Sequence, residues 1–591
     1  FFSSRRRHTR FLYVSWARDV YKRQIIIVGT LDWVVIGIFF LALIGIIVWV
    51  VKQKQNDSAD YFLGGRDATW LAIGASIFAS NIGSEHLIGL AGAGASSGMA
   101  MAHWEIQGWM ILILGWVFVP FYSRSMVYTM PEFLERRYNP QSRTILSVIS
   151  LISYVLTKVA VTVYAGGLVF QQVFGIKELW GIDFFWIAAI GLVVLTALYT
   201  IFGGMKSVLY TSVLQTPILL LGSLIILVLG FKELGGWDEM MSICSAVTVN
   251  EYGDTMTQLI RDNNDPNFPW LGALVGSAII GFWYWCTDQF IVQRVLSGKN
   301  EKEARRGTIF GAYLKLLPVF LFLIPGMIAF ALHQKYIGAG GEGFLPLLAN
   351  GTANADAAFP TLVAKLLPAG VKGLVVCGIL AALMSSLASL FNSSAMLFTI
   401  DFYKRFKPET PEKKLVGIGQ IATVVIVILG ILWIPIMRSV GDVLYTYLQD
   451  VQSVLAPGIA AAFLLGICWK RTSAKGGMWG LIAGMIIGLT RLGAKVYYSN
   501  TAITDSSMFK YLFYDLNWLF FCGWMFLFCI IVVIAVSLMT EAPSAEKIQG
   551  LVFGTSTPEQ KAATRASWNH WDIIHTVIIL AITAAFYWYF W

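Results

Sequence analysis

The chain has 591 residues, of which 57% are hydrophobic and only 13% are charged, with a formal net charge of +9. A soluble globular protein carries roughly 25% charged residues, so this composition excludes an ordinary soluble domain. Residues 33–51 and 415–437 contain no charged side chain, and apolar stretches of about 18 residues or more are typical of membrane spans. The six cysteines form no CxxC pair or Cys/His cluster, which argues against a metal or redox site. The sequence therefore predicts an all-α, multi-spanning membrane protein.

The first 24 residues differ from the rest of the chain. They read FFSSRRRHTRFLYVSWARDVYKRQ, resemble translated sequencing-adapter sequence, and hold seven basic residues and one acidic residue. We expect residues 1–24 to be non-native and exclude them from the fold. Without them the formal net charge falls from +9 to +3, so the apparent basicity gives no reason to expect a nucleic-acid partner.

Hydrophobic segments predict fourteen spans in chain order. They cover residues 31–51, 69–94, 100–123, 144–176, 184–201, 207–231, 270–296, 308–334, 370–403, 414–437, 443–469, 475–497, 516–539 and 570–590. The wholly aromatic segment 586–591 fits an interfacial belt at the end of the last span.

Charge in the connecting loops predicts the orientation of these spans. Lys and Arg concentrate in alternate loops, namely 52–68, 124–143, 297–307, 404–413 and 470–475. The long loop 232–269 holds seven acidic residues against two basic ones. Because cytoplasmic loops are enriched in Lys and Arg, the basic loops are expected in the cytoplasm and both termini outside it.

The second span is interrupted by a polar cluster, Ala79-Ser80-Asn81-Ile82-Gly83-Ser84-Glu85-His86. Unpaired polar groups facing lipid cost several kcal/mol each. A helix break is tolerated where it lines a cavity, and many transporters build substrate and ion sites from such breaks. The alternative is a packing face of small residues whose Ser and Asn side chains bond between helices.

A second cluster of small polar residues lies in the ninth span. Ala382, Ser385 and Ser386 are spaced i, i+3 and i+4 and share one helix face. Two hydroxyls beside a carbonyl offer the oxygen ligands that a hard cation prefers. Sodium is the ion that this arrangement suggests, since neutral oxygens hold a monovalent ion weakly. A serine-rich packing face is the alternative.

Several other spans contain ionisable or amide side chains, which are functional candidates by default inside a membrane. Glu105 lies in the third span, Lys315 in the eighth and Gln449 in the eleventh. With the aromatic run Trp283-Tyr284-Trp285 they would suit a polyhydroxylated ligand, because hydroxyls need both donors and acceptors and sugar faces stack on rings. A structural ion pair between Glu105 and Lys315 is the alternative. A membrane enzyme using His86 lacks any accompanying nucleophile or metal triad.

Long motifs in order identify a family resemblance between about Asp60 and Arg471. They are GASIFASNIGSEHLIGLAGAGASSG (74–98), TMPEFLERRY (129–138), WYWCTDQFIVQRVLSGKN (283–300), YLKLLP (313–318), ALMSSLASLFNSSAMLFTIDFYKRF (382–406) and APGIAAAFLLGICWKR (456–471). With these motifs the chain resembles the sodium/solute symporter family, in its sodium/glucose cotransporter branch.

The resemblance implies a LeuT-like core of two inverted five-helix repeats. The expected layout is an additional N-terminal helix in 25–68, a first repeat in 69–231, an extracytoplasmic loop in 232–269, a second repeat in 270–469 and three additional helices in 470–591. Each repeat would begin with a broken helix, at Asn81–Ser84 and near Tyr284–Trp285.

The resemblance also assigns roles to individual residues. The sodium site falls on backbone oxygens of Ala79, Ile82 and Ala382 and on the hydroxyls of Ser385 and Ser386. Sugar contacts fall on Asn81, His86, Glu105, Lys315, Gln449 and Ser389, with Tyr284 as the inner aromatic gate and Trp285 beside it. His86 matches the human glucose carriers, whereas the bacterial galactose carrier has glutamine there.

Two positions depart from the family pattern. Ser212 stands where the family commonly has an aspartate that is implicated in a second sodium site and in ion exit. We therefore expect one sodium per sugar. Gly281 replaces an asparagine that contacts sugar in the bacterial galactose carrier, so sugar preference does not transfer position by position.

Together these features predict a transporter, not an enzyme. It would couple inward Na⁺ flow to uptake of a glucose- or galactose-like hexose by alternating access, in the bacterial inner membrane, with the lipid bilayer and a small-molecule sugar as its partners. We expect no nucleic acid and no obligate protein partner. The alternatives are symport of inositol, another polyol or an organic anion, and a sugar sensor that accumulates nothing.

Overall fold

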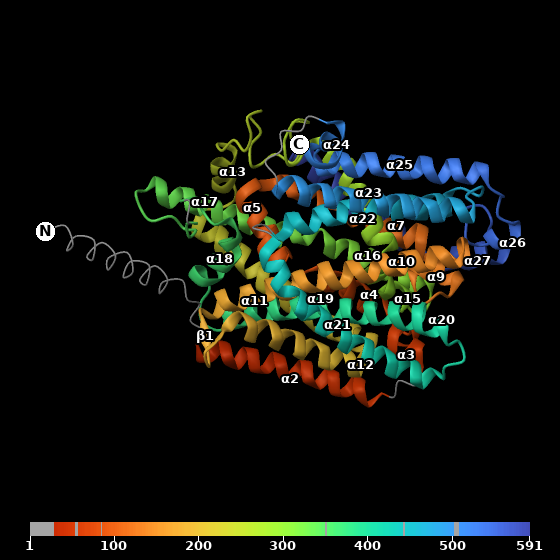
Figure 1. Cartoon of the computed structure of the whole chain (residues 1–591). Coiled ribbons are helices and arrows are strands. Elements are labelled where there is room, and N and C mark those ends of the chain that lie inside the picture. The colour runs from red at the N-terminus through yellow and green to blue at the C-terminus, as the bar shows by residue number, and fades with distance from the viewer. Residues whose placement is uncertain (1–28, 54–56, 84, 349–350, 441–443, 501–506) are drawn as a thin grey trace.

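The computed structural model describes residues 29–591 except 54–56, 84, 349–350, 441–443 and 501–506. The expectation about residues 1–24 lies outside this described part. The chain forms one bundle of helices, with α2 along one edge and α25 along the opposite edge (Figure 1). Within the described residues, strands are limited to β1 (Glu178–Leu179), paired antiparallel with β2 (Ile182–Asp183). The expected all-α class is confirmed.

The first half of the chain contains the following elements. They are α2 (Thr30–Lys52), α3 (Ser58–Leu63), α4 (Trp70–Asn81), the π-helix η2 (Glu85–Leu90), α5 (Ala91–Ser97), α6 (Ala102–Glu105), α7 (Gly108–Ile113), η4 (Leu114–Phe118), α8 (Val119–Ser125), α9 (Met130–Arg137), α10 (Pro140–Ser153), η5 (Tyr154–Val159), α11 (Ala160–Phe174), α12 (Phe184–Leu234) and α13 (Trp237–Ser245).

The second half contains a similar succession followed by the C-terminal helices. They are α14 (Trp270–Gly281), η6 (Phe282–Thr287), α15 (Gln289–Leu296), α16 (Glu301–Lys315), η7 (Val319–Leu323), α17 (Ile324–Gly338), α18 (Ala358–Leu366), α19 (Val371–Met396), η9 (Leu397–Tyr403), α20 (Lys404–Phe406), α21 (Glu412–Val440), α22 (Leu444–Cys468), α23 (Ala474–Asn500), α25 (Trp518–Met539), α26 (Ala545–Ile548), α27 (Pro558–Ala566) and α28 (His570–Tyr589).

Among the described residues, eleven helices are long and apolar enough to cross a membrane. The fourteen expected spans differ from this number for identifiable reasons. The apolar helix at the start of the second expected span, α4, has only 12 residues, and the apolar part of α11 is also short. The fifth and sixth expected spans form the single helical run α12.

The bend in α12 lies at Gly204, between the two spans expected there. A straight helix of 51 residues would be about 76 Å long, far more than the roughly 30 Å of a bilayer core. Gly204 has φ 54° and ψ −151°, which divides the run. A Cβ at this position would lie 2.4 Å from the carbonyl oxygen of Tyr61, so both conformation and space require glycine here.

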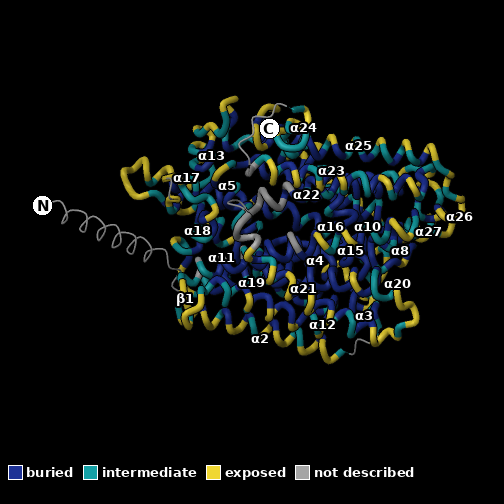
Figure 2. The backbone as a smooth tube through the Cα atoms, in the orientation of Figure 1, coloured by how far each residue is buried: buried dark blue, intermediate teal, exposed yellow. Residues whose placement is uncertain are grey.

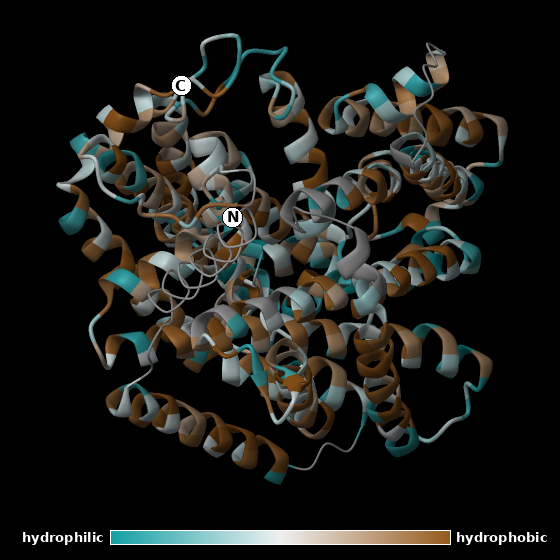
Figure 3. Cartoon of the chain, turned by 60° about the vertical axis from the view of Figure 1, so that its left-hand side comes forward, coloured by the Kyte–Doolittle hydropathy of each residue, from teal (hydrophilic) through white to brown (hydrophobic). Residues whose placement is uncertain are grey.

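Outer and inner helices differ sharply in exposure (Figure 2). In α2, Ile38 and Leu41 are 62% and 71% exposed, and the outer helices carry apolar surface (Figure 3). In water such an exposed apolar surface would promote aggregation, whereas a helix that faces lipid requires it. The central helix α19 is almost wholly buried and packs against α4 and α12. The candidate polar residues therefore lie at the centre of the bundle.

The basic and acidic loops lie at opposite ends of the bundle. Helices α9 and α20, which belong to the basic loops, lie at one end, and α13 of the acidic loop lies at the other (Figure 1). This separation is the one that the positive-inside rule requires of loops on opposite membrane faces.

Both expected helix breaks are present in the described chain. Helix α4 ends at Asn81, Ile82 is extended with φ −81° and ψ 109°, and the chain re-enters a helix at η2. The second break lies at Asp288, with φ −74° and ψ 126°, one turn beyond Tyr284 and Trp285. The aspartate itself sets this position, since its side chain caps α15 by accepting from the backbone N–H of Phe290.

Candidate functional site

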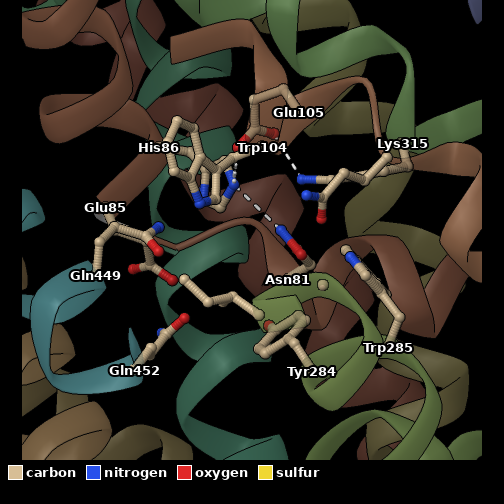
Figure 4. Close-up of a pocket in the computed structure, with 13 residues that line it drawn as sticks. Asn81, Glu85, His86, Trp104, Glu105, Tyr284, Trp285, Lys315, Gln449 and Gln452 are labelled. Carbon is tan, nitrogen blue, oxygen red and sulfur yellow. Dashed lines mark hydrogen bonds and ion pairs between the residues drawn. The ribbon is translucent and has the colours of Figure 1, made fainter. Parts of the chain in front are cut away.

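A polar cavity lies between the two helix breaks. The residues around it come from α4, η2, α6, α14, η6, α16 and α22, so segments far apart in the chain meet there (Figure 4). Its lining residues are Asn81, Glu85, His86, Trp104, Glu105, Gln107, Ile280, Gly281, Tyr284, Trp285, Lys315, Gln449 and Gln452. Seven of the eight residues expected to contact a solute are in this set.

One wall of the cavity is a row of polar groups in close contact. Lys315 Nζ donates to Glu105 Oε2 at 2.6 Å, and Glu105 Oε1 lies 3.4 Å from His86 Nε2. The same His86 nitrogen lies 3.1 Å from Asn81 Nδ2. The Lys315 ammonium also lies 5.4 Å from the centre of the Trp285 ring. The ion pair between Glu105 and Lys315, which the sequence analysis gave as a structural alternative, is therefore present and lines the cavity.

Four polar atoms at the cavity have no hydrogen-bond partner within the described part of the protein. They are Glu85 Oε2, His86 Nδ1, Trp104 Nε1 and Gln449 Oε1. More than about 90% of buried polar groups in proteins are hydrogen-bonded, so four exceptions at one cavity require an explanation. The set offers acceptors and donors together, which is what a hydroxyl-rich molecule would satisfy.

Ser389, the remaining expected solute contact, is not among the lining residues. Its Oγ lies 2.7 Å from Ser80 Oγ and donates to the Ser385 carbonyl at 2.7 Å. The contact between Ser80 and Ser389 joins α4 to α19 just before the break, whereas the bond to Ser385 lies within α19.

The expected ion ligands lie where α4 and α19 pack together. Ala79 and Ile82 flank the end of α4, while Ala382, Ser385 and Ser386 share a face of α19, and all five are at most 3% exposed. Because α4 ends at Asn81, its last carbonyls lack regular intrahelical partners. These five residues are therefore buried on two helices that pack against each other.

Ser212 reaches the same place from α12. Its Oγ lies 3.3 Å from Ser385 Oγ and 3.5 Å from Ser76 Oγ, and it donates to the Val208 carbonyl at 2.6 Å. A serine here adds a neutral oxygen and no charge.

Gln107 fills the space beside Gly281. A Cβ on that glycine would lie 2.5 Å from Gln107 Oε1, and Gln107 donates to the Ser277 carbonyl at 2.8 Å. An amide group thus lies at the cavity beside Gly281, supplied by a different part of the chain.

Sequence reasoning missed several residues at or near the cavity. Glu85, Trp104 and Gln452 line it. A buried ion pair lies near the Tyr284 ring, in which Lys158 Nζ donates to Asp288 Oδ2 at 2.6 Å. The Lys158 ammonium lies 4.9 Å from the centre of the Tyr284 ring. The sequence could have identified this pair, because ionisable residues within membrane spans are functional candidates and both residues lie in expected spans.

His103, which neighbours Glu105 in sequence, points away from the cavity. Its Nδ1 lies 3.0 Å from Tyr587 Oη and its Nε2 lies 3.1 Å from the Leu259 carbonyl. It therefore joins α6 to the acidic loop 232–269 and to α28.

Comparison with known proteins places this geometry in a family. The family model described as the sodium:solute symporter family matches residues 61–484. Human sodium/myo-inositol cotransporter 2 is 37% identical over 538 residues, covering 89% of this chain and 79% of that protein. Sodium/glucose cotransporter 1 of Ovis aries is 38% identical over 526 residues, covering 86% and 78%.

A solved structure shares the fold. A Na⁺-coupled sialic acid symporter in a substrate-bound outward-open state matches with a TM-score of 0.70 at 22% identity, covering 87% of this chain and 99% of that one. The expected LeuT-like transporter fold is confirmed. From the family match and the relatives together, the chain belongs to the sodium:solute symporter family, in its sodium/glucose cotransporter branch, and is a multi-pass membrane symporter with Na⁺ as its coupling ion.

Proposed function

We propose that the protein couples inward Na⁺ flow to uptake of a glucose- or galactose-like hexose. The cavity between the two breaks supports this proposal, because beside aromatic faces it offers donors and acceptors that have no partner among the described residues. Polar groups in such a site fix a ligand's orientation, and rings such as Trp285 and Tyr284 stack on apolar sugar faces. Asn81, His86, Glu105, Lys315 and Gln449 would contact the hydroxyls.

Sodium would bind at the oxygens of Ala79, Ile82, Ala382, Ser385 and Ser386. Ala79 lies in the last turn of α4 and Ile82 directly follows Asn81, the last residue of that helix. An ion held there would fix the shape of the break and thereby the position of Asn81 and His86 in the cavity. Its effect on the transport cycle is limited to its difference in affinity between the outward-open and inward-open states.

The aromatic gate and its support suggest how solute would leave. Tyr284 lies between the cavity and the Lys158–Asp288 pair. Movement of this ring would open a path toward the end of the bundle that carries α9 and α20. We propose that this end is cytoplasmic, that both termini are extracytoplasmic, and that the protein works in the bacterial inner membrane.

We further propose a stoichiometry of one sodium per solute. Ser212 supplies only a neutral hydroxyl beside Ser385, and a site for an additional hard cation is favoured by carboxylate ligands. The repeats proposed for residues 69–231 and 270–469 each contain one of the two breaks at their start.

A cyclitol is the second candidate solute. Relatives in several mammals are named sodium/myo-inositol cotransporters at 36–37% identity, and inositol presents the same kind of hydroxyl-rich ring. A panel of labelled hexoses, myo-inositol and an organic anion, offered to proteoliposomes with an inward Na⁺ gradient, separates these solutes. The proposal predicts Na⁺-dependent hexose uptake. Uptake of only inositol or only the anion would replace the hexose, and solute-evoked current without accumulation would indicate a sensor.

A further inference from the structure

Helix α15 begins at the second break and lies toward the end of the bundle that carries α9 and α20 (Figure 1). The proposed exit path runs toward this end, which is called the exit end below. All eight residues of α15 are buried, and the helix packs against α3, α4, α16 and α19. The Phe290 ring lies 6.2 Å from the Tyr284 ring. A path that opens past Tyr284 therefore borders on α15.

One amide fastens α15 to two neighbouring elements. Gln293 Nε2 donates to the Phe62 carbonyl of α3 at 2.7 Å and to Asn392 Oδ1 of α19 at 2.6 Å. Gln293 Oε1 accepts from Ser393 Oγ at 2.7 Å. The side chain is fully buried. Donor and acceptor atoms of this amide are thus both used in holding α15 against α3 and α19.

A second amide, one turn earlier on the same face of α15, adds to this fastening. The backbone N–H of Met130 in α9 donates to Gln289 Oε1 at 2.8 Å. Gln289 Nε2 lies 3.4 Å from the sulfur of Met396, the last residue of α19. Separating α15 from α9 and α19 would break these contacts together with those of Gln293.

Arg294, the next residue along α15, is in the opposite situation. Its side chain is fully buried, and none of its three nitrogens has a hydrogen-bond partner among the described residues. Its guanidinium lies 5.0 Å from the centre of the Phe290 ring, while Asp288 is bonded to Lys158 at 2.6 Å. An arginine side chain stays protonated in proteins, and a buried charge without a hydrogen-bonded partner is costly.

We infer that Gln293 and Arg294 set the balance between a closed and an open exit end, with Gln293 favouring closure and Arg294 favouring opening. Movement of α15 away from α3 and α19 breaks the Gln293 bonds. The same movement lets water from the exit end hydrate the Arg294 guanidinium. Two adjacent residues thus bias one two-state element in opposite directions. This inference rests on the proposed exit path past Tyr284.

The test measures how often α15 separates from α19. Met396→Cys introduces a thiol at their contact, where residue 396 is fully buried. Purified protein without Na⁺ is treated with a hydrophilic maleimide, and peptide mass spectrometry follows modification at residue 396, resolved from the six native cysteines. In this background Gln293→Leu should speed labelling about tenfold or more, because buried hydrogen bonds of the closed state are lost. Arg294→Met should slow labelling about tenfold or more, because the closed state no longer buries a bare charge.

Three further variants keep the outcome interpretable. Arg294→Lys retains the charge and should label at nearly the wild-type rate. The double variant Gln293→Leu/Arg294→Met combines opposite effects and should also lie near the wild type. Gln420→Leu removes a single amide bond to the Ile201 carbonyl, 3.1 Å long, from α21, and should change the rate less than about twofold. Thermal unfolding in detergent checks that each variant folds.

The opposite signs of the two effects make the inference open to refutation. Faster labelling in both single variants would show that they only loosen the packing of α15. An unchanged rate in Arg294→Met would show that the guanidinium does not favour opening, and an unchanged rate in Gln293→Leu would show that its bonds do not hold the end closed. Labelling requires no transport, so absent Na⁺-driven uptake would contradict the proposed function separately.

Discussion

The buried ion pair between Glu105 and Lys315 allows a binding role to be separated from a structural one. Its atoms are 2.6 Å apart, and both side chains are at most 5% exposed. Replacing one partner leaves a buried charge alone, which costs about 3–5 kcal/mol of stability. Glu105→Gln and Lys315→Met should each show this loss. The double variant removes both charges and should recover most of the stability.

Uptake is expected to follow a different pattern from stability. Each of the two side chains faces the cavity and offers the solute a charge-assisted hydrogen bond worth about 1.5–3 kcal/mol. Losing both hydrogen bonds would weaken the free energy of solute binding by about 3–6 kcal/mol, which corresponds to a rise in solute KM of roughly 10²- to 10⁴-fold. The double variant should therefore be stable but deficient in transport.

Two assays on the same preparations measure the two effects. Thermal unfolding in detergent reports stability, and Na⁺-driven uptake into proteoliposomes reports KM. The partly exposed pair of Arg136 and Glu132 is the control, since exposed pairs contribute about 0–1 kcal/mol. A double variant with wild-type KM would show that the pair does not bind solute and is purely structural.

Three further substitutions test the ion and solute sites separately. Ser386→Ala removes one proposed sodium ligand and should raise the Na⁺ concentration for half-maximal uptake about tenfold with unchanged solute preference; an unchanged Na⁺ titration would contradict the ligand assignment. Gln449→Ala should raise solute KM about three- to tenfold and leave the Na⁺ titration unchanged. A change in Na⁺ dependence alone would argue against a solute contact at Gln449. Ser212→Asp introduces a carboxylate at the position whose hydroxyl now lies 3.3 Å from Ser385 Oγ; reversal potentials should show the Na⁺-to-solute ratio rising from one to two, and a ratio of two already in the wild type would be evidence against the single-ion proposal.

Hydrophobic length predicted the helices well where a span is one continuous helix. The span expected at 31–51 is α2, Thr30–Lys52, because an apolar run of that length has no other stable state in lipid. The break after Asn81 was also predictable, since a dense polar cluster interrupts an apolar segment. The second break lies one turn beyond Tyr284, near which it was expected, because the Asp288 side chain caps the next helix.

The composition of the cavity was less predictable than its location. Gln107 lies in the space beside Gly281, and the two positions are distant in sequence. Glu85 precedes His86 directly, yet whether it faced a partner or the cavity depended on the path of the backbone around Gly83. Such features follow from contacts between helices, and periodicity within one helix does not encode them.

The central claim is that an inward Na⁺ gradient drives solute uphill, and one measurement addresses it most directly. Purified protein in proteoliposomes with equal solute on both sides is given an inward Na⁺ gradient, and internal labelled solute is followed over time. If Na⁺ and solute move together, internal solute should rise transiently above the external concentration and then fall as the Na⁺ gradient dissipates. Identical internal solute with and without the Na⁺ gradient would contradict it.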